Sequence, residues 1–249
     1  MKIGVLGGGQ LGRMLALAGH PIGLECVCFD ASPDACAGQV GELVVGEITD
    51  VAAVDAWAKG VDVITYEFET FPPEVVGHLA AGNDVIPNAH ALATAQDRWY
   101  EKRMFGELDI PVPPFRLANT REEIISACSE LETPLVVKSR TGGYDGKSQV
   151  RVRRHDEASL EEAIGLLEHG GVVVEQFIDF HFEVSVIGVR GANGDVAIYP
   201  VTQNNHRDGI LRTSITKRRS KLPRLSGTWQ LSRIESIAKP PISPFISVI

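Results

Sequence analysis

The chain has 249 residues, of which 44% are hydrophobic and 22% are charged, an ordinary balance for one large or two ordinary globular domains. Its formal net charge of −8 argues against a general nucleic-acid binder, because such surfaces need clustered Lys and Arg. No apolar run reaches the length that crosses a bilayer, and the N-terminus lacks the pattern of a signal peptide. We therefore expect a cytoplasmic protein with neither nucleic-acid nor membrane partners.

The four cysteines follow no metal-binding or redox spacing. They are Cys26, Cys28, Cys36 and Cys128, and the first two lie in a strand-like run. Buried thiols are therefore favoured over a disulfide framework or a metal site.

The first 96 residues alternate strand and helix signals, which predicts a parallel α/β sheet covered by helices on both faces, a Rossmann-like domain. Strand-like runs lie at 2–6, 23–29, 42–45, 61–65 and 84–86, and helical patterns at 11–18, 51–58 and 73–81.

The pattern changes after residue 96, where we place a domain boundary. A charged helix over 97–108 precedes a proline-stiffened connector over 109–115. A strand near residue 115, a helix from about 120, a strand ending at Lys138, a helix over 156–167 and strands at 172–177, 182–189 and 196–199 follow. Residues 97–215 therefore predict an α+β domain with an antiparallel sheet.

A glycine loop, Gly7 to Gly12, follows the first strand and satisfies G-x-G-x-x-G, with Asp30 at the end of the second strand. This pattern allows a nicotinamide dehydrogenase, in which the acid binds ribose. The helix N-terminus could equally receive the phosphate of a sugar-phosphate substrate, or the glycines could serve only a tight turn.

An acidic cluster, Thr65-Tyr-Glu67-Phe-Glu69-Thr70, follows the fourth predicted strand of the parallel sheet. The carboxyl ends of such strands are where open α/β sheets place ligand groups. Glu67 and Glu69 are therefore candidate substrate-facing carboxylates, and solvated loop carboxylates are the alternative reading.

The segment from Pro134 to Lys147 couples a buried strand ending in Lys138 to a loop with three glycines. Glycines let backbone N–H groups approach a polyphosphate, and a lysine at a strand end supplies a fixed positive charge. A tight hairpin with solvated charges would explain the same residues. The strand that ends at Glu175 to Ile178 could bind an adenine ring through its main chain, and Glu183 could accept hydrogen bonds from ribose.

Together these motifs resemble the 5-(carboxyamino)imidazole ribonucleotide synthetases of the ATP-grasp superfamily, the ATPase subunits of phosphoribosylaminoimidazole carboxylase in purine biosynthesis. The resemblance covers about residues 1–215. It rests on GGGQLGRM at 7–14, TYEFE at 65–69, RTGGYDGK at 140–147, VEQFIDFHFEVSVIG at 174–188 and NNHRDGILRTS at 204–214. It implies that ATP phosphorylates bicarbonate and that the amine of aminoimidazole ribonucleotide captures the activated carboxyl group, with ATP and Mg²⁺ as cofactors. A homodimer is left open.

The resemblance also implies the site residues. Those that match ATP-contacting positions are Arg98, Lys138, Gly143, Tyr144, Asp145, Gly146, Lys147, Ser148, Gln149, Glu175, Gln176, Phe177, Ile178, Glu183 and His206. Those with implied catalytic roles are Tyr144, Asp145, Glu69 and Lys138, and those implied to bind the ribonucleotide are Gly9, Gln10, Leu11, Glu67 and Glu69. Ser148 departs from the glycine usual at its position, and His206 on its own would be a solvated histidine in a polar turn.

The last stretch, 216–249, does not resemble the family. It holds seven Lys and Arg against one Glu, and it lacks the segment in which the family carries its magnesium ligands. We expect an incomplete ATP-grasp domain, a disordered and unrelated tail over 216–249, marginal solubility and no carboxylation by the chain as it stands. A natural basic tail is the alternative. A dehydrogenase and a non-catalytic nucleotide-binding remnant remain the competing functions.

Overall fold

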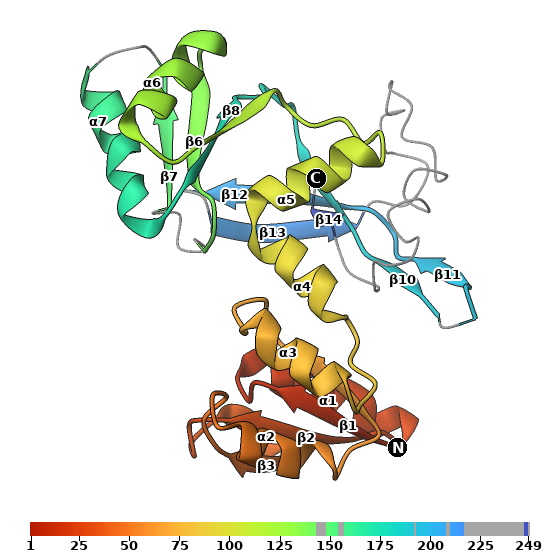
Figure 1. The fold of residues 1–249 in the computed structure, drawn as a ribbon. Helices are drawn as coiled ribbons and strands as arrows, with labels where there is room; N and C mark the ends of the chain where they lie inside the picture. Colours follow the sequence, from red (N-terminus) through yellow and green to blue (C-terminus); the bar gives the residue numbers. More distant parts are fainter. Residues whose placement is uncertain (143–147, 154–156, 192, 208–209, 217–246, 249) are drawn as a thin grey trace. The chain divides into compact units, whose positions relative to one another are not determined.

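The computed structural model describes residues 1–142, 148–153, 157–191, 193–207, 210–216 and 247–248 (Figure 1). The chain divides into two compact units between Ala93 and Thr94. The sequence predicts this boundary near residue 96. Within the described residues, no helix is long and apolar enough to cross a membrane.

The first unit is built on a parallel four-stranded sheet in the order β3-β2-β1-β4. Its strands are β1 (Lys2–Leu6), β2 (Glu25–Asp30), β3 (Glu42–Val45) and β4 (Val63–Tyr66). The predicted parallel sheet is confirmed. The predicted strand at 84–86 is wrong as an extended element, because only an isolated bridge joins Val85 to Ile64.

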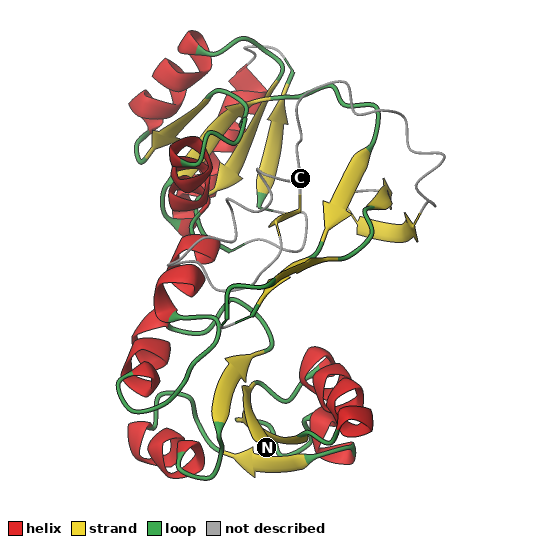
Figure 2. Cartoon of the chain, turned by 90° about the vertical axis from the view of Figure 1, so that its right-hand side faces the viewer, coloured by secondary structure: helices red, strands yellow, loops and turns green. Residues whose placement is uncertain are grey.

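Helices cover both faces of this sheet, as Figures 1 and 2 show. On one face lie α1 (Gln10–Gly19) and the short helix η2 (Cys36–Gln39), and on the other lie α2 (Val51–Ala58) and α3 (Pro73–Ala80). Helix α1 buries its small residues Gly12, Ala16 and Gly19. Helices α2 and α3 contribute Trp57 and Leu79 to a larger apolar cluster with Phe29 of β2.

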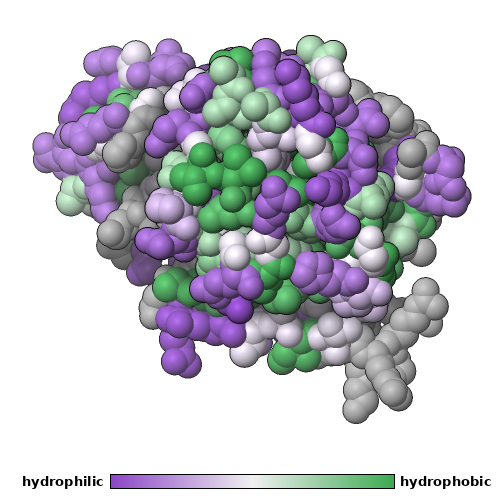
Figure 3. Space-filling view, turned by 90° about the horizontal axis from the view of Figure 1, so that it is seen from below, coloured by the Kyte–Doolittle hydropathy of each residue, from purple (hydrophilic) through white to green (hydrophobic). Residues whose placement is uncertain are grey.

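Part of the apolar surface of α1 remains exposed. Leu11, Met14, Leu15 and Leu17 are between 42% and 61% exposed. Figure 3 shows one face of the molecule, where apolar patches alternate with hydrophilic side chains.

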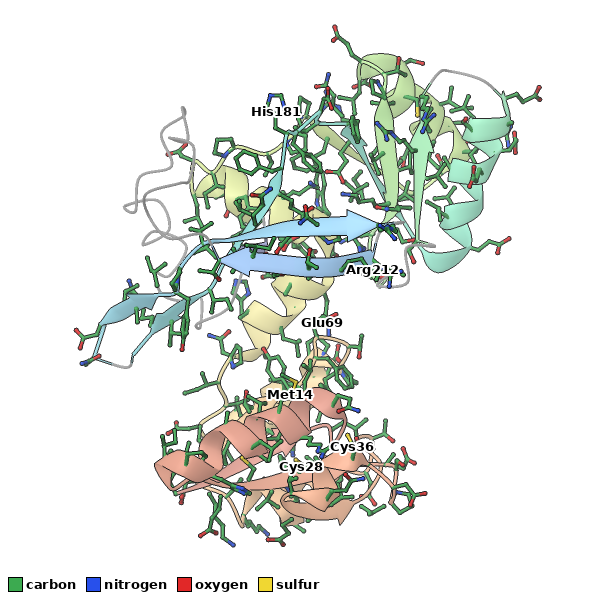
Figure 4. The ribbon with its side chains drawn as sticks, turned by 180° about the vertical axis from the view of Figure 1, so that it is seen from behind. Met14, Cys28, Cys36, Glu69, His181 and Arg212 are labelled. Carbon is green, nitrogen blue, oxygen red and sulfur yellow. The ribbon has the colours of Figure 1, made fainter. Side chains whose placement is uncertain are left out.

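The cysteines are all free, and Cys26, Cys28 and Cys128 are buried. Burial is the main cause that raises the pKa of the Cys28 thiol to about 12. Figure 4 places Cys28 and Cys36 within the first unit. A thiol with so high a pKa carries almost no thiolate at neutral pH, so Cys28 is inert.

The second unit contains an antiparallel sheet in the order β5-β8-β6-β7. Its strands are β5 (Phe115–Ala118), β8 (Val172–Gln176), β6 (Leu135–Ser139) and β7 (Gln149–Val152). Helices α6 (Arg121–Glu130) and α7 (Glu157–Gly165), the latter continued by η3 (Leu166–His169), pack on it through an apolar cluster (Figure 1). Helices α4 (Ala89–Gln96) and α5 (Arg98–Glu107) precede it in the chain. The predicted α+β architecture is confirmed, although α4 and β7 were missed.

A second sheet of this unit has the order β13-β12-β9-β14, and a separate hairpin pairs β10 with β11. The strands are β9 (Glu183–Val186), β10 (Gly188–Arg190), β11 (Val196–Ile198), β12 (Thr202–Arg207), β13 (Ile210–Thr216) and β14 (Ser247–Val248). The predicted strand over 182–189 is therefore two strands. The polar turn expected around His206 is wrong at that residue, which lies in β12.

Three residues of the tail that the sequence predicts to be disordered, 216–249, are described as strand residues. Thr216 ends β13, and Ser247–Val248 pairs antiparallel with β9. Residues 217–246 and 249 lie outside the described residues.

Candidate nucleotide site and glycine loop

The glycine loop of the first unit surrounds a carboxylate of its own chain. The N–H groups of Gly9 and Gly12 donate hydrogen bonds to Oε1 and Oε2 of Glu67, at 3.0 and 2.6 Å. A Cβ atom at Gly7 would lie 2.5 Å from Cγ of Glu67, and one at Gly9 would lie 2.8 Å from its Oε1. The spaced glycines therefore leave room for Glu67 beside the N-terminus of α1, where the helix dipole favours a negative charge.

Asp30 is also bonded within the first unit. Its carboxylate accepts hydrogen bonds from the N–H groups of Gly8, at 2.7 Å, and Ser32, at 2.8 Å. This geometry corrects the dinucleotide interpretation of the loop. Asp30, at the position where a dinucleotide fold has its ribose-binding acid, closes a turn instead. The N–H groups of Gly9 and Gly12 bind the carboxylate of Glu67.

Glu69 lies in the loop that follows β4, where Figure 4 labels it. Its side chain is half-buried. The flanking rings of Phe68 and Phe71 stack with their centroids 4.6 Å apart. Of the two candidate carboxylates, Glu67 is held by the N–H groups of Gly9 and Gly12. Glu69 lies two residues farther along the loop.

In the second unit, Glu175 is a buried carboxylate between two lysines. Only 4% of the residue is exposed, its Oε2 lies 2.5 Å from Nζ of Lys102, and its Oε1 forms an ion pair with Lys138. Burial opposes ionisation most strongly, but the two ammonium groups together outweigh it and lower the pKa of Glu175. The structure thus brings together two predicted residues, Lys138 and Glu175, and adds Lys102.

Arg98 holds the start of the second glycine loop. Its Nη1 donates to the carbonyl oxygens of Ser139 and Gly142, both at 2.7 Å, and its backbone N–H donates to the carbonyl of Arg140 at 2.9 Å. Gly142 has φ +72°, a left-handed conformation that favours glycine. Arg98 therefore fixes the backbone from which the loop departs. Gly143, Tyr144, Asp145, Gly146 and Lys147 lie outside the described residues.

Asp97 connects the start of α5 to Arg140, which follows β6. Its Oδ1 accepts the N–H groups of Trp99 and Tyr100 as the N-cap of α5, at 2.9 and 3.3 Å, and its Oδ2 accepts Nε of Arg140 at 2.7 Å. The residue is 8% exposed. One carboxylate therefore stabilises both the start of α5 and the strand end that carries Arg140.

We expect Asp97→Ala to lower the free energy of unfolding of the second unit by about 2 kcal/mol, because a helix cap and a partly buried ion pair are both lost. Asp97→Asn keeps the cap and should lose less. Urea unfolding followed by the fluorescence of Trp99, which packs edge-on against Phe115, would measure both. Equal stability of wild type and Asp97→Ala would contradict this role.

At the end of β8, some backbone N–H groups are already hydrogen-bonded within the chain. The N–H groups of Gln176 and Phe177 donate to the carbonyls of Pro114 and Pro134, both at 2.9 Å. Among the described residues, the N–H of Ile178 has no hydrogen-bond partner. The guanidinium of Arg151 lies 3.7 Å from the ring centroid of Phe177 and fixes that ring.

Glu183 and His206 come together from neighbouring strands. Strand β9 pairs with β12 so that Glu183 faces Asn204, and His206 Nδ1 lies 3.4 Å from Glu183 Oε1. Ser148 precedes β7, and Gln149 is its first residue. Sequence reasoning missed Asp97, Lys102 and Arg151. The spacing of Arg98 and Lys102, four residues apart, could have shown that one face of α5 belongs to this site.

Two family descriptions match the sequence. The ribonucleotide synthetase preATP-grasp domain matches residues 1–96, and the ATP-grasp domain matches residues 103–231. The second match alone spans more than half of the chain.

Several relatives and solved structures are N5-carboxyaminoimidazole ribonucleotide synthases or synthetases. The N5-carboxyaminoimidazole ribonucleotide synthase of Pseudomonas aeruginosa is 42% identical over 215 residues, which is 86% of this chain and 59% of that protein. The synthetase structure from Thermus thermophilus is 45% identical with a TM-score of 0.77, covering 85% of this chain and 57% of that one. The Aspergillus clavatus synthase in complex with ADP and 5-aminoimidazole ribonucleotide is 25% identical with a TM-score of 0.85, covering 98% and 64%.

The chain therefore spans less than two thirds of the length of these relatives. Over that part, the family match, the sequence identity and the fold agree with one another. The chain belongs to the ATP-grasp family, and within that family it is a relative of the N5-carboxyaminoimidazole ribonucleotide synthases.

Proposed function

We propose that the chain carries the nucleotide site of an ATP-dependent ligase that carboxylates 5-aminoimidazole ribonucleotide with bicarbonate, releasing ADP and phosphate, in purine biosynthesis. The observation that carries this proposal is the cation cluster at the start of the second glycine loop. Lys138 lies one residue before the end of β6, beside the buried Glu175, and Arg98 holds the loop backbone. The names of the relatives supply the substrate class.

In this proposal, Lys138 and Arg98 neutralise phosphate charge that moves during transfer, together with the loop from Gly143 to Gln149. The adenine ring lies at the end of β8, where the N–H of Ile178 donates to it and Gln176 and Phe177 complete the edge. Glu183 accepts hydrogen bonds from the ribose, and His206, whose Nδ1 lies 3.4 Å from Oε1 of Glu183, orients that carboxylate.

We further propose that Tyr144, Asp145 and Glu69 act near the imidazole. Gly9, Gln10 and Leu11, at the N-terminus of α1, would bind the ribonucleotide phosphate. The hydrogen bonds of Glu67 limit this second role, because its carboxylate already accepts the N–H of Gly9. A phosphate must therefore use the N–H groups of Gln10 and Leu11 or displace Glu67.

Magnesium has no ligand set among the described residues, which include no group of three or more His, Cys, Asp and Glu that could hold a metal ion. These residues do not fit a metal site, and the roles proposed here pass through none. A homodimer and a cytoplasmic location remain predictions of the sequence.

We expect the chain to bind ADP or ATP and not NADH. The group of Lys102, Lys138 and Glu175 carries a net positive charge that attracts phosphates, whereas the N–H of Gly8 is bonded to Asp30 and the N–H of Gly9 to Glu67. Calorimetric titration of the three nucleotides would measure this. Binding of NADH without binding of ADP would contradict the proposed site and favour the dehydrogenase.

The proposed substrates can be tested by measuring turnover. In a chimera of residues 1–215 with the C-terminal part of the Pseudomonas aeruginosa relative, we expect ADP formation that requires both bicarbonate and 5-aminoimidazole ribonucleotide. A coupled assay of ADP would show it. ADP formation that is unaffected by the ribonucleotide would contradict the proposed substrate.

A further inference from the structure

The charged face of α5 contributes more to the nucleotide site than the residues assigned so far. Arg98, Glu101 and Lys102 are three and four residues apart, and such residues share one face of a helix. Lys102 is anchored there, because its side chain is only 13% exposed and its ammonium lies 5.7 Å from the ring centroid of Phe115. This lysine has no role in the function proposed above.

Glu175 needs at least one cation to remain ionised. A carboxylate buried without a partner loses its hydration and takes up a proton. Here Lys102 and Lys138 share the two oxygens of the one carboxylate, so the three groups carry a net charge of one positive unit. One lysine is therefore in excess, and Lys138 is the more exposed of the two, at 31% against 13% for Lys102.

We propose that Lys102 is a positioning residue for nucleotide binding, which keeps Glu175 neutralised while Lys138 moves its charge to the phosphates. This role rests on the proposed nucleotide site. Without Lys102, Lys138 would be the one close cation of Glu175 among the residues that the structure describes. A nucleotide would then have to break that pair and leave a buried carboxylate without a partner.

The groups that face Glu175 come from two elements. Among the described residues, Lys138 of β6 and Lys102 of α5 are ion-paired with Glu175, and Glu101 of α5 interacts with it electrostatically, while Arg98 acts on Glu101. Burial raises the pKa of Glu101, although Lys102, Arg98 and Lys138 oppose that shift. Because the loss of Lys102 also raises the pKa of Glu101, wild type and variant are compared in a Glu101→Gln background, where a change in proton uptake on binding reports the changed neutralisation of Glu175.

Lys102→Met tests the role by calorimetry of ADP binding to the full chain near pH 7.5, in two buffers of different ionisation enthalpy. We expect ADP affinity to fall about 10- to 100-fold, because removing one partner of a buried pair leaves the other charge uncompensated. We also expect the variant to take up close to one more proton per ADP than wild type, since the abandoned Glu175 binds it. The affinity of the variant should therefore fall more steeply than that of wild type as the pH rises.

Two controls separate charge from structure. Lys102→Arg keeps the cation and should restore the affinity and remove the extra proton uptake. Arg103→Met, on the next residue of α5, removes an exposed cation paired with Glu107 and should leave both unchanged. If Lys102→Met folds poorly, Lys102→Met combined with Glu175→Gln removes the uncompensated charge. ADP affinity should then differ little between this double variant and Glu175→Gln.

The possible outcomes are distinct. Lower affinity without extra proton uptake would mean that Lys102 contacts the nucleotide itself, which overturns the positioning role. Unchanged affinity and uptake in Lys102→Met would overturn it as well, while the proposed nucleotide site would stand. Absence of ADP binding to the wild-type chain would overturn the proposed site and this role together.

Discussion

Lys138→Met should lower ADP formation about 100- to 1,000-fold in the chimera described above, the scale seen when a preorganised charge-stabilising group is removed from a site of transfer. The reason is that Lys138 lies near the end of a rigid strand, just before the second glycine loop. Stability should change little, because Glu175 keeps its contact with Lys102. Steady-state assays with ATP, bicarbonate and 5-aminoimidazole ribonucleotide would measure the loss.

A matched control is Lys59→Met, which removes an exposed lysine from the first unit and should leave turnover unchanged. Urea unfolding of Lys138→Met would separate lost chemistry from lost folding. ADP formation by Lys138→Met at the wild-type rate would exclude a role of this charge in phosphate transfer.

Gly7→Ala should lower the free energy of unfolding of the first unit by about 3–4 kcal/mol, as the sum of a left-handed backbone and a steric clash. Gly7 has φ +97°, and its added Cβ would lie 2.5 Å from Cγ of Glu67. Glu67 can move away only by giving up its hydrogen bonds to Gly9 and Gly12. The fluorescence of Trp57, which is 5% exposed, would follow urea unfolding in a background with Trp99→Phe and Trp229→Phe.

Gly23 provides the control, because it also has a positive φ, +77°, but a Cβ there would meet nothing within 4 Å. Gly23→Ala should lower the free energy of unfolding by only the cost of the left-handed backbone, about 1–2 kcal/mol. Equal losses at Gly7 and Gly23 would show that crowding against Glu67 contributes nothing and that the loop opens freely.

The layers of both units, and Lys138 and Glu175 as candidate nucleotide residues, could be predicted from the sequence pattern. Short apolar runs separated by helical periods can form only a parallel sheet with covering helices, and β1, β3 and α2 begin and end where the pattern places them. Lys138 and Glu175 were predictable because each follows an apolar run and lies one residue before the end of its strand. The motifs around them were sufficient to indicate the family.

Strands with polar residues escaped prediction. β12 and β13 carry Asn, His, Arg and Thr, so they lack the apolar alternation that marks a half-buried strand, and their pairing with each other and with β9 defines them. His206 therefore reads as a turn residue in the sequence and lies in a strand in the structure. β7 is short, four residues, and it is fixed by its pairing with β6.

The partner of each charged group was decided only by the tertiary structure. G-x-G-x-x-G predicts exposed amides at a helix N-terminus, but it cannot show whether the anion they bind is a ligand or Glu67, which lies 55 residues beyond Gly12 in the chain. Likewise, Lys102 reads as one charge on a polar helix until β8 brings Glu175 within 2.5 Å of it. Sequence patterns report local geometry and burial, whereas hydrogen bonds and ion pairs between distant residues depend on how strands and helices pack.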